Sequence, residues 1–255
     1  MNIATIIPFR LKSSRFPNKA LYRYNGVPII EHALKISERI ETSITILTSS
    51  REDFKLINDS VNLKGYNYKF IETSELCRSA TERVLQIYEK VDSDIYMSIP
   101  IDETALSPKE INRVLKEIVN EQFEAYTLWC DFFCIEDAES PLSAKVVTNQ
   151  HDEVIYMSRS TIPISKSGKI APEYLKKNVG VHFFRKNFLH SLNSHRHTDT
   201  ILDKLEGLEQ LRWLELGLKL KAKKIEHFGC GIDVIEQVKQ LETRMRCLPK
   251  QKKSE

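Results

Sequence analysis

The first 101 residues alternate between short apolar runs and segments in which apolar residues recur with helical spacing, and this alternation constrains the fold more than any other feature. The predicted strands are 3–8, 43–48, 68–72 and 95–101, and the predicted helices lie between them at 27–40, 52–62 and 79–91. Strands joined through helices run parallel and are covered on both faces. The sequence therefore predicts an α/β, Rossmann-like fold with a mostly parallel central sheet flanked by helices.

The second half of the chain breaks this alternation. Four strand-like runs follow one another with little helix between them, at 125–134, 144–148, 154–159 and 179–185. They predict an embedded antiparallel insertion around residues 125–200. A helix at 203–218, a strand at 224–228 and a helix at 234–246 are predicted to follow. No Pro/Gly/Ser-rich linker or internal repeat divides the sequence, so a single domain over residues 1–255 is expected.

The helix predicted at 203–218 carries leucines at three-residue steps, which indicates a stripe that faces the core. These leucines are Leu202, Leu205, Leu208 and Leu211. Three other residues, Glu206, Gln210 and Trp213, share a second face by three- and four-residue spacing. That face is either a ligand wall or a solvated surface, and the surface is the preferred interpretation.

Charge and hydropathy exclude several classes of protein. With 38 basic and 35 acidic residues the net charge is +3, so no large field of one sign is available to hold a polyanion, and general nucleic-acid binding is not expected. No run approaches the roughly 20 apolar residues that span a bilayer, and the N-terminus lacks the charged segment and cleavage site of a signal peptide. We therefore expect a soluble, untargeted protein without a membrane partner.

The five cysteines indicate a reducing compartment, which we take to be the cytoplasm. They are odd in number and include no Cys-x-x-Cys pair, a usage typical of thiols that do not form disulfides. A zinc site is not expected either, because the nearest candidates, Cys130 with Cys134 and His195 with His197, lack a second pair of ligands.

The loop after the first predicted strand is rich in cations. Ligands of open parallel sheets bind beyond the carboxyl ends of the strands, so a site is expected at such a loop. Its basic and hydroxyl residues are Arg10, Lys12, Ser13, Ser14, Arg15 and Lys19. Arginine makes forked bonds to phosphate oxygens, and lysine supplies a mobile point charge. The loop is therefore either a polyphosphate site or a solvated basic loop.

Two other loops after predicted strands carry carboxylates. Asp102 and Glu103 follow the strand at 95–101, and Asp233 follows the strand at 224–228. If these strands are neighbours, Asp102 and Asp233 can share a Mg²⁺, which takes few carboxylates and completes its shell with water and phosphate oxygens. The alternative for each is an aspartate in a turn or a helix cap.

Residues 79–83, Ser-Ala-Thr-Glu-Arg, open a predicted helix with a capping box, in which Ser79 is the cap and Glu82 stands three residues on. This pattern is structural in its own right. A helix start also presents unpaired amides to an anion or a nucleobase carbonyl, so Ser79, Thr81 and Arg83 are candidates for nucleotide contacts.

The residues of these loops also form a pattern that resembles a known family. Residues 7–19, Ile-Pro-Phe-Arg-Leu-Lys-Ser-Ser-Arg-Phe-Pro-Asn-Lys, resemble the signature Ile-Pro-Ala-Arg-x-x-Ser-Thr-Arg-Leu-Pro-Gly-Lys of the 3-deoxy-manno-octulosonate (Kdo) cytidylyltransferases. Further blocks similar to that family are 79–83, 102–103, 145–147, 158–159, 162–163, 208–212 and 231–233. The resemblance therefore extends over most of the chain.

The resemblance implies a nucleotidyltransferase fold whose antiparallel insertion serves dimerisation, and a cytoplasmic enzyme that acts as a homodimer. The implied reaction couples CTP to a 3-deoxy-ulosonic acid, Kdo or a modified relative, with Mg²⁺ as the cofactor. Its products are the CMP-sugar, for surface polysaccharide synthesis, and pyrophosphate.

The resemblance also implies roles for individual residues. The nucleotide would be held by Arg10, Ser13, Ser14, Arg15, Lys19, Ser79, Thr81 and Arg83, and the sugar acid by Arg159, Asn178, His182, Glu209 and Gln210. Asp102 and Asp233 would bind the metal, and together with Lys19 they would be the catalytic residues. Since none of the seven histidines stands beside the metal pair as a general base, the metal is expected to activate the attacking hydroxyl.

The sequence departs from the family pattern, and several of the altered positions face the sugar in that family. Pro100 and Ile101 stand where the family has Gln-Gly, and residues 177–182, Lys-Asn-Val-Gly-Val-His, stand where it has Arg-His-Ile-Gly-Ile-Tyr. These departures suggest a modified acceptor acid. Two other interpretations stay open: a nucleotidyltransferase for a sialic-acid-like acceptor or another NTP, and a non-catalytic nucleotide- or sugar-binding protein.

Overall fold

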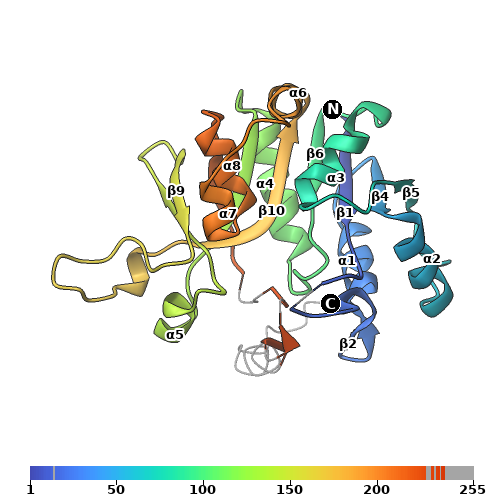
Figure 1. Cartoon of the computed structure of the whole chain (residues 1–255), viewed down its shortest axis with the longest axis horizontal. Coiled ribbons are helices and arrows are strands. Elements are labelled where there is room, and N and C mark those ends of the chain that lie inside the picture. Colours follow the sequence, from blue (N-terminus) through green and yellow to red (C-terminus); the bar gives the residue numbers. More distant parts are fainter. Residues whose placement is uncertain (14, 228–230, 233, 236, 239–255) are drawn as a thin grey trace.

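The structure is a computed structural model that describes residues 1–13, 15–227, 231–232, 234–235 and 237–238 (Figure 1). Its strands are β1 (Ile3–Pro8), β2 (Arg23–Tyr24), β3 (Val27–Pro28), β4 (Ile44–Ser49), β5 (Lys69–Glu72), β6 (Ile95–Ser98), β7 (Ala125–Cys130), β8 (Lys145–Thr148), β9 (Val154–Ser158), β10 (Lys177–Arg185) and β11 (Lys221–Lys224). Its α-helices are α1 (Ile29–Ser37), α2 (Arg51–Ser60), α3 (Ala80–Ile87), α4 (Pro108–Val119), α5 (Ile135–Glu139), α6 (Lys186–Ser194), α7 (Leu202–Glu206) and α8 (Glu209–Glu215).

The central sheet has the strand order β11-β7-β10-β6-β1-β4-β5. The strands β6, β1, β4 and β5 are mutually parallel, which confirms the predicted α/β fold with a mostly parallel sheet. The strand β10 runs antiparallel to its neighbours β6 and β7, and β11 pairs parallel with β7. The carboxyl ends of β1 and β6 therefore lie side by side at one edge of the sheet.

Helices cover both faces of this sheet (Figure 1). On one face α3, α6 and α8 pack against a cluster that includes Ile6 and Phe184. On the other face α1, α2 and α4 pack against clusters that include Ile7 and Met97. Because successive side chains of a strand point to opposite faces, the neighbours Ile6 and Ile7 belong to different clusters. Burial on both faces explains why these strands are continuous apolar runs.

The strands of the second half divide between the central sheet and a hairpin. Whereas β7 and β10 belong to the sheet, β8 and β9 pair with each other. The hairpin joins the sheet where Lys145 lies opposite Lys177 and where Glu153 bridges to Lys221. We call residues 131–176, which contain α5 and this hairpin, the hairpin region; it projects to the left in Figure 1.

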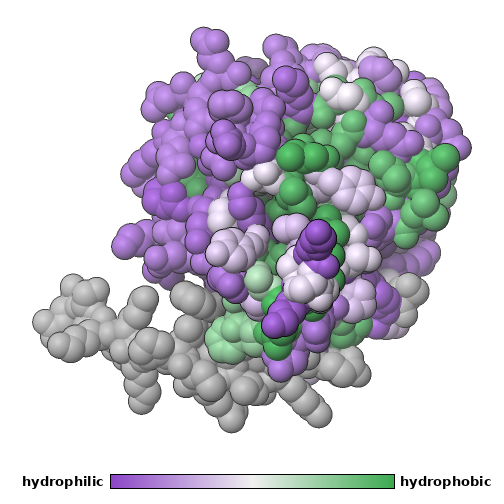
Figure 2. Space-filling model, turned by 90° about the vertical axis from the view of Figure 1, so that its left-hand side faces the viewer, coloured by the Kyte–Doolittle hydropathy of each residue, from purple (hydrophilic) through white to green (hydrophobic). Residues whose placement is uncertain are grey.

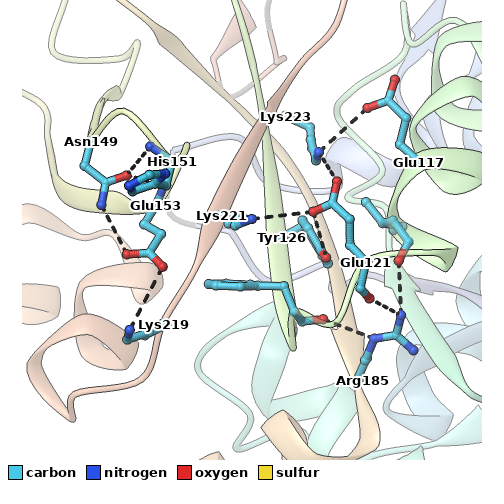
Figure 3. A network of polar contacts seen from close by, with 12 residues as sticks. Glu117, Glu121, Tyr126, Asn149, His151, Glu153, Arg185, Lys219, Lys221 and Lys223 are labelled. Carbon is cyan, nitrogen blue, oxygen red and sulfur yellow. Dashed lines mark hydrogen bonds and ion pairs between the residues drawn. The ribbon is translucent and has the colours of Figure 1, made fainter.

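A polar network holds β11 at the edge of the sheet (Figure 3). Lys221 and Lys223 of β11 both pair with the carboxylate of Glu121, which follows α4, and the hydroxyl of Tyr126 donates to the same carboxylate at 3.3 Å. The Arg185 guanidinium at the end of β10 donates to the backbone carbonyl of Glu121 at 2.8 Å. These contacts anchor the start of the chain segment that leads toward Asp233.

The helix predicted at 203–218 is divided into α7 and α8 by Gly207. The φ of Gly207 is 62°, in the left-handed region that favours glycine. The predicted leucine stripe is partly wrong, because Leu205 is 77% exposed while Leu208 and Leu211 are buried. Because the chain turns at Gly207, the core-facing residues of α7 and α8 do not follow one continuous helical repeat.

The face that carries Glu206, Gln210 and Trp213 is not a solvated surface, so the preferred interpretation of the sequence was wrong. Trp213 is 1% exposed and Gln210 is buried as well. The strand predicted at 224–228 lies at Lys221–Lys224, and most of the helix predicted at 234–246 lies outside the described residues. Within the part of the chain that is described, no helix combines the length and hydropathy needed to span a bilayer.

Candidate active site

A groove opens at the edge of the sheet where β1 and β6 end and α3 begins. It consists of two adjoining cavities, of about 200 Å³ and about 330 Å³. Both cavities are lined by Ser79, Ala80, Pro100 and Asp102, which form the boundary between them. We call the smaller one the basic cavity and the larger one the polar cavity.

The basic cavity is lined by the cations of the loop after β1. Its wall includes Arg10, Ser13, Arg15 and Lys19. A buried contact anchors this loop, since the backbone N–H of Leu11 donates to Asp53 Oδ2 at 3.1 Å. The exposed Lys12 pairs with Glu75 instead of lining the cavity, and Ser14 lies outside the described residues. The structure thus brings most of the predicted phosphate-binding residues together.

Lys19 and Asp102 form an ion pair at the boundary of the two cavities. Lys19 Nζ lies 2.5 Å from Asp102 Oδ2, and the two side chains are 13% and 20% exposed. Asn18, with a φ of 56°, adopts the left-handed conformation that asparagine tolerates and precedes the 3₁₀ turn that begins at Lys19. In this partly dry environment the attraction between the two charges is stronger than in water.

The start of α3 contributes a second wall to the basic cavity. Ser79 caps the helix as predicted, because its hydroxyl accepts from the backbone N–H of Glu82 at 3.2 Å. Arg83 also lines this cavity, and its guanidinium donates to Thr73 Oγ1 at 2.6 Å. Burial lowers the pKa of Arg83. Part of the hydrogen-bonding capacity of Arg83 is therefore committed to the fold.

Thr81 reaches neither cavity of the groove and instead orients Glu209. Its backbone N–H donates to Glu209 Oε2 at 3.2 Å. Burial raises the pKa of Glu209, and the hydrogen bonds from Ser79 and Thr81 offset only part of this effect. Thr81 therefore acts on the polar cavity only through the Glu209 carboxylate, which lines that cavity.

The polar cavity brings together all the residues predicted to contact the sugar acid, namely Arg159, Asn178, His182, Glu209 and Gln210. His182 Nε2 lies 2.7 Å from Gln210 Nε2, and burial lowers the pKa of His182 to about 3. The imidazole is therefore neutral at neutral pH and accepts a hydrogen bond from the Gln210 amide. Asn178 Oδ1 accepts from Thr127 Oγ1 at 3.0 Å, which fixes the Asn178 amide.

Glu206, which the sequence indicates as a surface residue, instead orients Arg159. Its carboxylate accepts from Ser158 Oγ at 2.7 Å and from the backbone N–H of Arg159 at 2.8 Å. The Arg159 guanidinium in turn donates to the backbone carbonyls of Glu206 and Gly207, at 2.6 Å and 3.2 Å. The break at Gly207 therefore supplies acceptors that fix the direction of the arginine.

Two buried contacts that the sequence did not indicate place three more residues, Glu103, His227 and Lys177, on the wall of the polar cavity. Glu103 lies 3.3 Å from His227, and Lys177 lies 2.9 Å from Asp137. Burial on its own raises the pKa of Glu103, but the contact with His227, the charge of Lys177 and the backbone N–H of Gly180 outweigh it and lower that pKa. In the sequence only the adjacent acidic residues 102–103 pointed to a site here. His227 and Asp137, which contact Glu103 and Lys177, lie far from them along the chain.

Asp102 fits the donor chemistry of a magnesium site. Mg²⁺ is usually bound by one or two carboxylates and completes its shell with water and phosphate oxygens, and Asp102 presents a carboxylate beside the basic cavity. Asp233 lies outside the described residues, so its convergence with Asp102 stays a prediction. Among the described residues no group of three or more metal-ligating side chains is assembled. The Asp102 carboxylate beside the cations of the basic cavity fits an ion that a phosphate-bearing ligand shares.

The groove separates two kinds of chemistry. The cations of the basic cavity converge on a space suited to a polyphosphate. The polar cavity offers a neutral imidazole, amides, carboxylates and an oriented guanidinium, which suit a polyhydroxylated acid. Because the two cavities meet at Asp102, the arrangement favours transfer of a phosphate-linked group from a ligand in one cavity to a hydroxyl in the other.

Comparisons with known proteins show that this chain is similar to cytidylyltransferases. A family model described as cytidylyltransferase matches residues 4–225. A mitochondrial 3-deoxy-manno-octulosonate cytidylyltransferase of Arabidopsis thaliana is 31% identical, with 96% of this chain and 83% of that protein aligned. The enzyme of the same name from Parabacteroides distasonis is 31% identical, with 93% and 96% aligned. An 8-amino-3,8-dideoxy-manno-octulosonate cytidylyltransferase of Shewanella baltica is 27% identical, with 96% and 99% aligned.

Solved structures share the fold. A CMP:2-keto-3-deoxy-manno-octonic acid synthetase complexed with CTP superposes with a TM-score of 0.82 at 24% identity, over 96% of this chain and 99% of that chain. A 4-diphosphocytidyl-2C-methyl-D-erythritol synthase from Anaerococcus prevotii superposes with a TM-score of 0.63 at 12% identity, over 96% and 98%. The chain therefore shares the overall fold of these two proteins.

Proposed function

The chain belongs to the cytidylyltransferase family, and we propose that it transfers the cytidylyl group of CTP to the anomeric hydroxyl of a 3-deoxy-ulosonic acid, Kdo or a Kdo-like relative. The products are the CMP-sugar and pyrophosphate. The names of relatives aligned over almost the whole chain support this substrate class.

One observation carries the proposal: the basic cavity and the polar cavity meet at Asp102. In the proposed complex Arg10, Arg15 and Lys19 bind the triphosphate, and the sugar acid occupies the polar cavity. The α-phosphorus then lies near Asp102, where a hydroxyl from the second cavity can reach it. Holding the two reactants in adjoining cavities converts their encounter into a step within one complex.

In the proposed step the anomeric oxygen attacks the α-phosphorus of CTP. A new phosphorus–oxygen bond forms, the bond to the β-phosphate oxygen breaks, and its electron pair leaves with pyrophosphate, while the hydroxyl proton passes to water. Lys19, Arg10 and Arg15 neutralise the charge that grows on the leaving group. Asp102 and Asp233 would hold Mg²⁺, which supplies further positive charge at the phosphate and lowers the pKa of the hydroxyl.

The polar cavity is assigned to the acceptor. Arg159, oriented by Glu206, is placed to bind the carboxylate of the sugar acid. The neutral His182–Gln210 pair and the amide of Asn178 provide hydrogen bonds for hydroxyl groups or an amine. Asn178 and His182 stand where the family signature has His and Tyr, so this wall supports a preference among modified acids.

The experiment is a two-dimensional substrate panel with purified protein and Mg²⁺. CTP, UTP, ATP and GTP are each combined with Kdo, 8-amino-3,8-dideoxy-Kdo and N-acetylneuraminic acid, and pyrophosphate release and product mass are measured. We expect a CMP adduct with CTP and one of the two octulosonic acids, at a rate at least tenfold above that with the sialic acid. Binding of CTP by calorimetry without turnover on any acid would instead support a non-catalytic protein.

We also propose that the protein is a homodimer that associates through the hairpin region. Large apolar side chains are exposed there: Phe133, Ile135, Ile155, Ile164 and Tyr174. Figure 2 views the molecule from that side, and hydrophobic residues are interspersed with polar ones on this face. Light scattering should give the mass of two chains, and Ile155→Asp should shift it toward one chain; a monomeric wild type would refute the dimer.

The proposed location is the cytoplasm. The thiols of Cys77, Cys130 and Cys134 are free, which supports a reducing compartment. Expression of a tagged protein followed by cell fractionation tests the location, and recovery outside the cytoplasmic fraction would contradict it.

A further inference from the structure

A third cavity, of about 960 Å³, adjoins the polar cavity and is not used by the proposed binding of either substrate. It lies among four helices, with Leu85 of α3, Leu192 of α6, Lys204 of α7 and Trp213 of α8 on its wall. We call it the outer cavity, because exposed residues such as Lys204 and Arg196 line it and water can enter. Its position next to the polar cavity provides a path from the acceptor site to solvent.

A carboxylate lies where the polar cavity and the outer cavity adjoin. Ser79, Gly207 and Glu209 line both of them, and of these three only Glu209 has an ionisable side chain. Ser79 lines the basic cavity as well, so all three cavities meet at this residue. Glu209 is hydrogen-bonded to Ser79. Its carboxylate is therefore next to the boundary where the proposed reaction brings the α-phosphorus and the anomeric hydroxyl together.

Hydrogen bonds from the start of α3 orient the Glu209 carboxylate. The backbone N–H of Thr81 donates to Glu209 Oε2 at 3.2 Å. Ser79 Oγ accepts from the backbone N–H of Glu82 at 3.2 Å, and its own hydroxyl proton is donated to Glu209. Both partners of Glu209 are donors, which favours the ionised carboxylate, the form that can take up a proton.

The surroundings of Glu209 also adjust its basicity. Burial raises the pKa of Glu209, the hydrogen bonds from Ser79 and Thr81 lower it, and the negative charge of Glu82 raises it further, so that the pKa stands above its ordinary value. A general base is most effective when its pKa lies near the operating pH, and an upward shift moves a carboxylate in that direction.

We propose that Glu209 is the general base of the transfer, which takes the proton of the anomeric hydroxyl and passes it to water in the outer cavity. The inference rests on the proposed function. As the O–H bond breaks, its electron pair stays on the oxygen, which forms the new bond to the α-phosphorus. The bond to the β-phosphate oxygen breaks, and its electron pair leaves with pyrophosphate. Protonated Glu209 then gives its proton to water and is again a carboxylate.

Glu209→Gln tests the proton transfer, because the amide keeps the size of the side chain and an acceptor for Thr81 but cannot take up the proton. Single-turnover rates of CMP-sugar formation are measured by rapid quench, with the acid that reacts fastest in the substrate panel, and the KM for that acid is measured in the steady state. The matched control is Glu89→Gln, since Glu89 is an exposed residue that lines the outer cavity.

Glu209→Ala provides a second measurement, chemical rescue. This substitution removes the carboxylate between the two cavities, so that formate from solvent can enter through the outer cavity and act as the base in its place. The same formate concentrations are applied to the wild type and to Glu209→Gln, in which the amide still fills the space. Circular dichroism of each variant is compared with that of the wild type.

We expect Glu209→Gln to lower the single-turnover rate by about 100-fold or more, while the KM for the acid stays within about threefold. Glu89→Gln should leave both values within about twofold of the wild type, because an exposed residue of the outer cavity touches no reacting atom. Formate should raise the rate of Glu209→Ala by about tenfold and leave the wild type and Glu209→Gln unchanged.

A near-normal single-turnover rate in Glu209→Gln overturns the inference, and so does a correctly folded Glu209→Ala whose rate does not respond to formate. A raised KM with little change in the single-turnover rate assigns Glu209 to acceptor binding and overturns the inference as well. A wild type that forms no CMP-sugar with any acid of the panel refutes the proposed function together with the inference. An active wild type beside an equally active Glu209→Gln refutes the inference alone.

Discussion

Lys19 Nζ and Asp102 Oδ2 lie 2.5 Å apart, so the last cation of the basic loop and the first carboxylate after β6 face each other at the centre of the groove. In the proposed complex each charge has a second partner, the triphosphate for Lys19 and the metal for Asp102. Ligand binding therefore adds an ionic partner for each of the two side chains. Because these side chains are largely buried before any ligand arrives, little ordering is required of them afterwards.

Lys19→Ala should lower kcat/KM for CTP by about 10- to 100-fold, since a hydrogen bond to a charged group contributes about 1.5–3 kcal/mol. Steady-state kinetics with varied CTP measures the effect. Lys12→Ala in the same loop is the matched control, because Lys12 is exposed and pairs with Glu75; its effect should be less than threefold. Equal effects of the two variants would argue against a specific role for Lys19.

Asp102→Asn and Asp233→Asn should each reduce kcat by about 100- to 1000-fold, the range found when a single group that stabilises transition-state charge is removed. Circular dichroism should give the spectrum of the wild type in both variants. Excess Mg²⁺ should recover part of the rate if metal affinity is the cause. Near-normal turnover of either variant would contradict its assignment to the metal.

Glu206→Ala should raise the KM for the sugar acid about tenfold, because Arg159 loses the carboxylate that fixes its backbone. The KM for CTP should not change, which makes it the internal control. Glu206→Gln keeps one acceptor oxygen and should show a smaller effect than Glu206→Ala. A rise in both KM values would show that Glu206 supports the whole groove and not the acceptor side alone.

The buried His182 should make the protein less stable in acid. Its pKa is lowered to about 3 in the fold against about 6.5 in an unfolded chain, so the unfolded state gains a proton first as the pH falls. The contribution of His182 to stability is therefore complete above pH 6.5 and declines as the pH falls toward 3. From pH 7.5 to 5.5 the loss is about 1 kcal/mol.

Urea unfolding at pH 7.5 and 5.5 measures this loss. His182→Gln should flatten the pH dependence by that amount, even though the loss of ring packing lowers stability at both values. His151→Gln, at an exposed site, should leave the dependence as in the wild type. An unchanged slope in His182→Gln would show that other groups cause the acid sensitivity.

The parallel part of the fold was predictable because each strand and helix is a local pattern. The runs at 3–8, 43–48 and 95–101 correspond to β1, β4 and β6. Ligand-binding residues were expected in the loops after β1 and β6, and these loops carry the cations of the basic cavity and Asp102. The helix α4 was missed even though Ser107 and Pro108 form a typical start, with the cap and the proline in their preferred positions.

The rest of the site could not be predicted because its signals are not local. Glu206 binds Arg159 across 47 positions of the chain, and Lys177 binds Asp137 across 40. Nothing near Glu206 in the sequence separates a carboxylate that orients an arginine from one that faces water. Trp213 was misjudged for a related reason, since the break at Gly207 changes which side of the segment faces the core.

The strand β10 runs from the hairpin region into the middle of the central sheet, and it carries both Asn178 and His182. Lys177 is paired on both sides, by β7 and β8, and His182 is paired on both sides, by β7 and β6, but between Val179 and His182 the register with β7 shifts. Such an irregularity re-aims the side chains of a strand. The two residues that depart from the family signature on this wall therefore lie on opposite sides of an irregular step in the ladder, and the geometry of that step sets how far apart their side chains meet a sugar acid.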